Sequence, residues 1–160
     1  MIRASRLADY GLLLMTQMAR GDGAVLRNAQ SLAVESGLPL PTVSKILKEL
    51  LHGGLLVSHR GPKGGYCLTR DAREITVAEI IAVLEGEIAM TECSHTASGV
   101  CGLEQMCPIR ANMQVISYAV RAALEQVTLS DLVQPLRLIT VRDIQGRLLP
   151  ALGVTTSKMQ

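Results

Sequence analysis

Apolar positions recur at helical spacing near the start of the chain and predict two helices. The first runs from about residue 5 to residue 20, and the second from about residue 28 to residue 37. Asn28 is a favourable N-cap for the second helix, and Gly37 can end it because glycine readily adopts a left-handed conformation. The apolar stripe of the first helix consists of Leu7, Gly11, Leu14, Met15 and Met18.

The clearest helical pattern begins at Pro41, a residue that suits the first turn of a helix. Two short helices joined by a glycine-containing turn form a helix-turn-helix, whose second helix enters the major groove of DNA. We expect Thr42, Ser44 and Lys45 to lie nearest the bases and Lys48 to lie toward phosphate. The apolar face that orients these side chains consists of Val43, Ile46, Leu47, Leu50 and Leu51.

Two strand-like runs, residues 55–59 and 66–69, follow this helix and flank a basic, glycine-rich connection. Such a hairpin directly after a helix-turn-helix is a wing. We expect Arg60 and Lys63 in the connection to reach a minor groove or phosphates.

The pattern after the wing predicts a helix over residues 76–85, an irregular loop over 91–107, and a long helix of about twenty residues from Pro108. Apolar residues of the long helix form a heptad seam, which a partner helix from a second copy would cover. An intramolecular core helix is the alternative. The seam consists of Ile109, Met113, Ile116, Val120, Ala123 and Val127.

These elements predict a mainly α fold, a winged helix-turn-helix with a two-stranded wing and a long C-terminal dimerisation helix. We divide the chain into a DNA-binding domain (1–73), a sensing and dimerisation region (74–133) and a tail (134–160) that is either loosely docked or disordered. A capping box that starts at Thr128 opens one further short helix before the tail.

Composition and charge agree with this division. The 160 residues include no Trp, no Phe and three Tyr, which favours a helical aliphatic core and argues against stacking of single-stranded nucleic acid. Residues 1–73 hold ten Lys/Arg against five Asp/Glu, a net of +5, whereas residues 74–160 hold six against nine, a net of −3. The charge division indicates that the first half meets a polyanion, and the predicted helix-turn-helix makes double-stranded DNA the expected partner.

Three of the four cysteines, Cys93, Cys101 and Cys107, lie in the predicted loop, whereas Cys67 lies in a wing strand as a buried small residue. With no signal peptide and no membrane span, we expect a cytoplasmic protein, in which clustered cysteines bind metal or act in redox chemistry. Thiolates are ligands for iron–sulfur clusters, and three of them leave one coordination position open. Zinc bound with His95 and a thiol switch are the alternatives.

In this order, the motifs resemble those of the Rrf2 family of bacterial winged-helix regulators, which includes the Isc and Suf cluster-assembly regulators and the nitric-oxide-sensing repressor NsrR. The resemblance covers the chain from about Ile2 to Val133. It rests on the runs Leu7–Tyr10, Leu40–Leu47, Leu55–Gly61, Gly64–Tyr66 and Thr128–Leu132, together with the three-cysteine loop.

The resemblance implies a homodimeric, DNA-binding repressor, not an enzyme, whose cysteine loop holds an iron–sulfur cluster beside the dimerisation helix. We favour a 2Fe-2S cluster over a 4Fe-4S cluster, and control of a Suf or Isc cluster-assembly operon over nitric oxide sensing. The family often supplies a histidine ligand three residues after the last cysteine, but this chain has Arg110 there. Asp9, reached from the other subunit as in NsrR-like members, is the preferred fourth ligand. The alternatives are His95 and an exogenous thiol or water.

Overall fold

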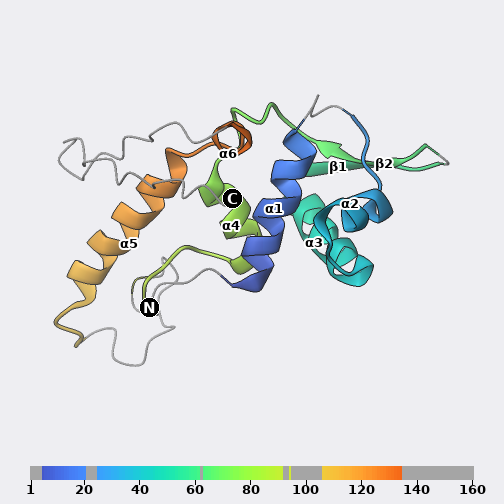
Figure 1. Ribbon diagram of the computed structural model, residues 1–160. Helices are drawn as coiled ribbons and strands as arrows, with labels where there is room; N and C mark the ends of the chain where they lie inside the picture. Colours follow the sequence, from blue (N-terminus) through green and yellow to red (C-terminus); the bar gives the residue numbers. More distant parts are fainter. Residues whose placement is uncertain (1–4, 21–24, 62, 92–93, 95–105, 135–160) are drawn as a thin grey trace, which may run out of the picture.

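The computed structural model describes residues 5–20, 25–61, 63–91, 94 and 106–134 (Figure 1). Over these residues the fold is mainly helical, with one two-stranded antiparallel sheet, as the sequence predicts. In chain order the elements are α1 (Arg6–Ala19), α2 (Ala29–Ser36), α3 (Leu40–His52), β1 (Leu56–His59), β2 (Gly65–Leu68), α4 (Val77–Glu85), α5 (Arg110–Glu125) and α6 (Leu129–Val133).

Local sequence signals set the ends of the first helices. The Ser5 hydroxyl caps α1 by accepting hydrogen bonds from the backbone N–H groups of the first turn. Asn28 caps α2 in the same way, its side-chain oxygen 2.7 Å from the backbone nitrogen of Ser31. Gly37 ends α2 with a φ of 70°, a left-handed conformation that glycine adopts without strain. The predicted caps at Asn28 and Gly37 are therefore confirmed.

A single aliphatic core joins the helix-turn-helix to the elements that follow the wing. Leu14 of α1 and Ile46 of α3 share this core with Ile80 of α4 and Leu129 of α6, and all four are completely buried. The core therefore contains residues from both sides of position 73. Its buried members are Leu14, Met15, Met18, Leu32, Val43, Ile46, Leu47, Leu50, Leu55, Leu56, Leu68, Ile75, Ile80, Leu84 and Leu129.

The chain returns to this core after α5 through a short antiparallel contact between Thr76 and Thr128. The Val77 N–H donates to the Val127 carbonyl oxygen at 2.9 Å, and the Leu129 N–H donates to the Ile75 carbonyl oxygen at 2.8 Å. Thr76 and Thr128 also begin the capping boxes of α4 and α6. The starts of these two helices are thus fastened to each other.

α5 lies apart from α2 and α3 and has α4 as its main neighbour (Figure 1). Its 16 residues are fewer than the predicted twenty, because Ile109 is the N-cap and Val127 lies beyond the last turn. The hydrogen bond from Val77 draws Val127 into the antiparallel contact instead. The predicted tail lies outside the described residues, except for its first residue, Gln134, which caps the C-terminus of α6. None of the helices within the described ranges is long and apolar enough to cross a membrane.

Candidate DNA-binding surface and cysteine loop

The predicted base-facing residues lie on α3. One face of this helix is fully buried and fixes the helix to the body of the molecule. Lys45 and Lys48 are exposed, whereas Thr42 and Ser44 are half-buried beside them. The N-terminal part of the second helix is the part that a helix-turn-helix presents to base edges. α3 therefore offers two cations and two hydroxyl groups at its surface. The fully buried face consists of Val43, Ile46, Leu47 and Leu50.

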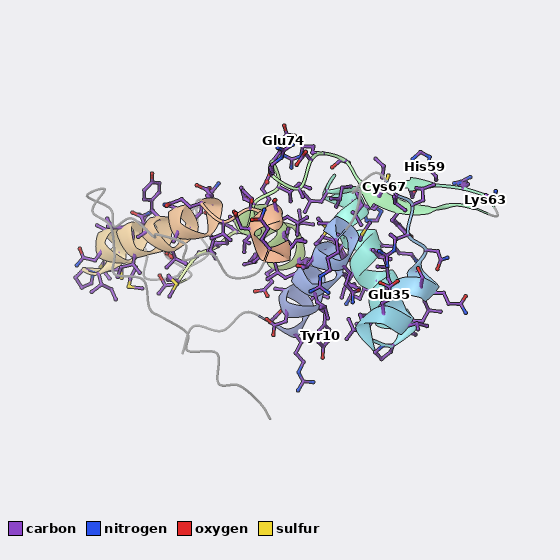
Figure 2. The ribbon with its side chains drawn as sticks, turned by 45° about the horizontal axis from the view of Figure 1, so that its top comes forward. Tyr10, Glu35, His59, Lys63, Cys67 and Glu74 are labelled. Atoms are coloured by element: carbon purple, nitrogen blue, oxygen red, sulfur yellow. The ribbon has the colours of Figure 1, made fainter. Side chains whose placement is uncertain are left out.

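The wing projects from the same end of the molecule as α3 (Figure 1). β1 and β2 pair antiparallel, with Leu56 opposite Leu68 at the buried end and His59 opposite Gly65 at the outer end. Arg60 and Lys63 are exposed in the connection, and Figure 2 shows Lys63 toward the tip of the hairpin. Both predicted wing cations are therefore accessible at the surface.

Cys67 lies in β2 and is only 8% exposed, which confirms the prediction of a buried residue.

Arg27 joins the wing to the helix-turn-helix, and the sequence patterns did not single it out. Its N–H and carbonyl groups pair with those of Tyr66, both at 2.8 Å, so residue 27 extends the wing sheet by one bridge. The approach is close, since a Cβ at Gly65 would lie 2.7 Å from the Arg27 carbonyl oxygen. The Arg27 guanidinium pairs with the Glu35 carboxylate of α2 and donates to the Gln17 carbonyl oxygen of α1 at 3.4 Å.

Of the predicted cluster ligands, the structure places Cys107 and Asp9. Cys107 is a free, half-buried thiol shortly before α5, and Asp9 is exposed in the first turn of α1. Cys93, Cys101 and His95 lie outside the described residues. Within the described ranges, no three His, Cys, Asp or Glu side chains are grouped to hold a metal ion.

A buried hydroxyl network fastens the start of the cysteine loop to α5. Ser94, which follows Cys93 in the chain, and Ser117 of α5 are 8% and 5% exposed. The Ser117 hydroxyl donates to Ser94 Oγ at 2.9 Å and accepts from the Met90 N–H at 2.9 Å. Ser94 Oγ in turn donates to the Thr91 carbonyl oxygen at 2.7 Å. This contact links residues far apart in the sequence, and the heptad pattern gave no sign of it.

The predicted seam on α5 is partly exposed. Ile109 and Ile116 are 54% and 45% exposed, and the other four seam residues are half-buried. Ser117 is the single buried residue of this helix. An exposed apolar row of this kind is typical of a protein–protein interface.

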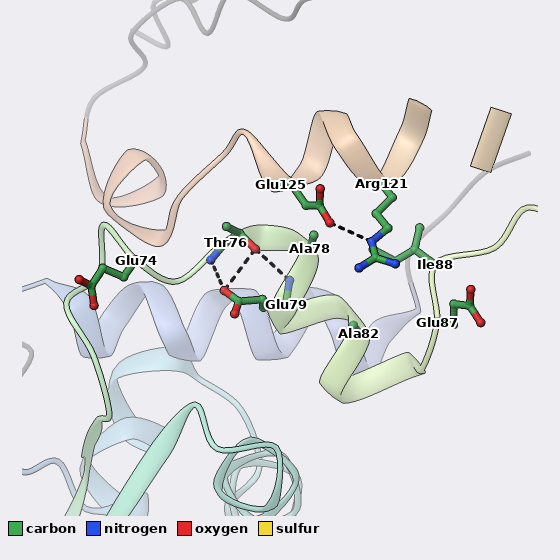
Figure 3. Close-up of a pocket in the computed structure, with 9 residues that line it drawn as sticks. All are labelled: Glu74, Thr76, Ala78, Glu79, Ala82, Glu87, Ile88, Arg121 and Glu125. Carbon is green, nitrogen blue, oxygen red and sulfur yellow. Dashed lines mark hydrogen bonds and ion pairs between the residues drawn. The ribbon is translucent and has the colours of Figure 1, made fainter. Parts of the chain in front are cut away.

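An acidic hollow separates α4 from α5 (Figure 3). Its charged groups are used largely in structure, because Arg121 pairs with Glu125 at 2.8 Å and Glu79 closes the capping box of α4. The pKa of Glu79 is lowered although burial opposes this, since the Thr76 N–H and the Arg70 guanidinium both donate to its carboxylate. Its excess of negative charge makes the hollow unsuitable for DNA. Its lining consists of Glu74, Thr76, Ala78, Glu79, Ala82, Glu87, Ile88, Arg121 and Glu125.

The sequence is similar to those of known transcriptional regulators. Residues 4–135 match the Rrf2 family model, described as an iron-dependent transcriptional regulator. The regulator IscR of Cronobacter sakazakii is 30% identical over 144 residues, which cover 90% of this chain and 88% of that protein. The repressor NsrR of Streptomyces coelicolor is 29% identical over 133 residues, which cover 82% of this chain and 88% of that protein.

The fold is similar to solved structures of such regulators. CymR, the global cysteine regulator of Bacillus subtilis, has a TM-score of 0.65 at 28% identity, covering 83% of this chain and 97% of that one. IscR of T. potens has a TM-score of 0.63 at 26% identity, covering 82% and 86%. These relatives regulate transcription and are not enzymes.

Proposed function

The chain belongs to the Rrf2 family of winged-helix transcriptional regulators, and from this premise we propose that it is a homodimeric repressor that senses iron–sulfur cluster status or redox state. The observation that carries the proposal is the order of parts along one chain: a winged helix-turn-helix, a three-cysteine loop, and a helix with an exposed apolar seam. The first part binds DNA, the second senses, and the third pairs two copies.

In the proposed complex, each copy places α3 in a major groove. Thr42, Ser44 and Lys45 contact base edges, Lys48 contacts phosphate, and the wing cations Arg60 and Lys63 contact the minor groove or the adjacent phosphates. The exposure of the four cations supports these roles. A chromosomal ligand also favours a cytoplasmic location.

Two copies pair through the α5 seam in this proposal. Ile109 and Ile116 are large apolar residues that would leave water on pairing. A dimer also matches the two-fold symmetry of the operators that helix-turn-helix proteins bind.

Cys93, Cys101 and Cys107 would hold the cluster, with Asp9 of the other copy as the fourth ligand and His95 as the alternative. Three soft thiolates fit iron–sulfur chemistry, and the free, half-buried thiol of Cys107 is consistent with a ligand near α5. A 2Fe-2S cluster is favoured over a 4Fe-4S cluster. When bound, the cluster supplies a redox-active and chemically labile centre. The Ser94–Ser117 contact would pass its gain or loss to α5.

The regulated genes in this proposal form a Suf or Isc cluster-assembly operon. The description of the family as iron-dependent and the similarity to IscR support this choice. The similarity to NsrR makes nitric oxide sensing the second candidate. A zinc site or a thiol switch is the third, since the solved structures include CymR, a cysteine regulator.

Anaerobic purification tests the sensor assignment. We expect a coloured protein that contains iron and acid-labile sulfide, and we expect Cys101→Ser to lose most of both. Cys67→Ala is the matched control, since Cys67 is buried in the wing, and it should keep its iron. A Cys101→Ser protein with full iron content and visible absorption would overturn the ligand assignment. Colourless protein with stoichiometric zinc, or metal-free protein that forms a disulfide, would support the third candidate.

A further inference from the structure

Arg27 contacts three parts of the DNA-binding half through its backbone and its guanidinium. Its backbone pairs with Tyr66 in the wing, and its guanidinium reaches both the Gln17 carbonyl in α1 and the Glu35 carboxylate in α2. We propose that the Arg27–Glu35 ion pair is a positioning device that sets the direction of the wing relative to α2 and α3. Operator affinity then depends on a pair of residues that need not touch DNA.

The wing needs such a device because a two-stranded hairpin is only marginally stable by itself. At its inner end Leu56 and Leu68 enter the core, but its outer end at His59 and Gly65 is exposed or half-buried. The bridge from Arg27 to Tyr66 lies toward that outer end, directly beside Gly65. Movement of residue 27 would therefore tilt the part of the wing that carries the cations.

The side chain of Arg27 holds residue 27 in place. The Arg27 side chain is only 22% exposed, whereas that of Glu35 is 48% exposed. Partly exposed ion pairs contribute little to global stability. α2 also keeps its own core anchor, the fully buried Leu32, without the pair. Loss of the pair should therefore loosen the wing and leave the fold intact.

Glu35→Ala distinguishes a positioning role from simple electrostatics, because the two predict opposite changes in DNA affinity. Removal of a negative charge from the basic half should strengthen DNA binding if charge alone matters. The DNA probe is a duplex that the wild-type protein selects from a randomised pool. If the pair positions the wing, Glu35→Ala should bind this duplex about fivefold more weakly, as expected for loss of roughly 1 kcal/mol. Equal or tighter binding by Glu35→Ala would overturn the inference.

Two further variants complete this measurement. Glu49→Ala removes the same charge from an exposed position on α3 and should bind the duplex as tightly as the wild type or more tightly. Glu35→Asp keeps a carboxylate on α2 for the Arg27 guanidinium, leaves the contact of Arg27 with Gln17 unchanged, and should retain most of the affinity that Glu35→Ala loses. A Glu35→Asp protein that binds the duplex as weakly as Glu35→Ala while its thermal unfolding stays normal would contradict a role for the pair itself.

Coupling to the wing is the decisive test, and it rests on the proposed wing contact with DNA. In a Lys63→Ala protein, Glu35→Ala should reduce DNA affinity by less than it does in the wild type, because the wing contact is already lost. In a Lys48→Ala protein the reduction should be as large as in the wild type. The reverse pattern would place the effect on α3 and overturn the inference. If Lys63→Ala alone does not weaken binding, the wing contact of the proposed function fails, and the inference fails with it. If Lys63→Ala weakens DNA binding but Glu35→Ala does not, the wing contact stands and only the positioning role of the ion pair is refuted.

Discussion

Ser117 holds the cysteine loop to α5 by hydrogen bonds within a buried site. Its hydroxyl serves both the Met90 N–H and Ser94 Oγ, so one substitution removes this partner from a half-buried N–H group and from a buried hydroxyl. Buried polar groups that lose a partner are costly, whereas exposed ones exchange it for water.

We expect Ser117→Ala to lower the free energy of unfolding by about 1–3 kcal/mol. Urea denaturation followed by circular dichroism measures this loss, and Ser58→Ala, at an exposed position in β1, is the control. If the sensor assignment holds, Ser117→Ala should also lose iron faster under air. Stability equal to that of the wild type would show that the network contributes nothing.

For single residues, the sequence predicts a role correctly when the residue acts on its own stretch of backbone. Asn28 and Gly37 act on the backbone of their own helix, so their identity is sufficient to predict their roles. The partners of Arg27 and Ser117 come from other elements, and only the folded chain brings them together. The placement of Cys107 and Asp9 is known, but their relation to the other predicted ligands stays a prediction.

Among the elements, α5 carries a partly exposed apolar row, the predicted seam, and within the described residues it packs mainly against α4. A charge at the centre of the row should prevent pairing, because it would be buried without a partner charge. We expect Ile116→Asp to be monomeric in sedimentation experiments at micromolar concentration, and to bind DNA at least about tenfold more weakly because two half-sites are no longer linked.

Gln114→Asp is the control for this prediction. It introduces the same carboxylate two residues earlier, on nearly the opposite side of the helix, where the side chain is exposed. The control should sediment as the wild type does. A dimeric Ile116→Asp protein would exclude the seam as the interface.

Most elements follow from the sequence, because the buried positions of α1, α3 and α4 repeat at helical spacing. The end of α5 does not. Val127 continues the heptad, but its carbonyl oxygen accepts a hydrogen bond from Val77 and the helix ends before it. A tertiary contact therefore overrides the periodic pattern at this point.

Across the whole molecule, positive and negative charge are separated. Residues 1–73, which include α3 and the wing, carry a net positive charge, and residues 74–160, which include α5, carry a net negative charge. Neutralised phosphates release counterions, so DNA affinity should fall steeply with salt. We expect Lys48→Ala to reduce the slope of log Kd against log salt by about 2 in a dimer, since each lost phosphate contact contributes about 0.9. Fluorescence anisotropy at several salt concentrations measures this slope.

Arg121→Ala is the control for the salt measurement. It removes one positive charge from α5, where Arg121 pairs with Glu125 far along the chain from the wing. Its slope should equal that of the wild type. The same reduction in both variants would mean that net charge, and not the predicted surface, governs the salt dependence.

The contact between Thr76 and Thr128 also has a mechanical consequence. It lies where α5 rejoins the core, and it fixes the first residues of α4 and α6 to each other. The C-terminal end of α5 is therefore joined through Val127 to the start of α4. Because α4 also packs against α1 and α3, we expect a displacement of α5, whose other end begins shortly after Cys107, to reach the DNA-binding half through α4.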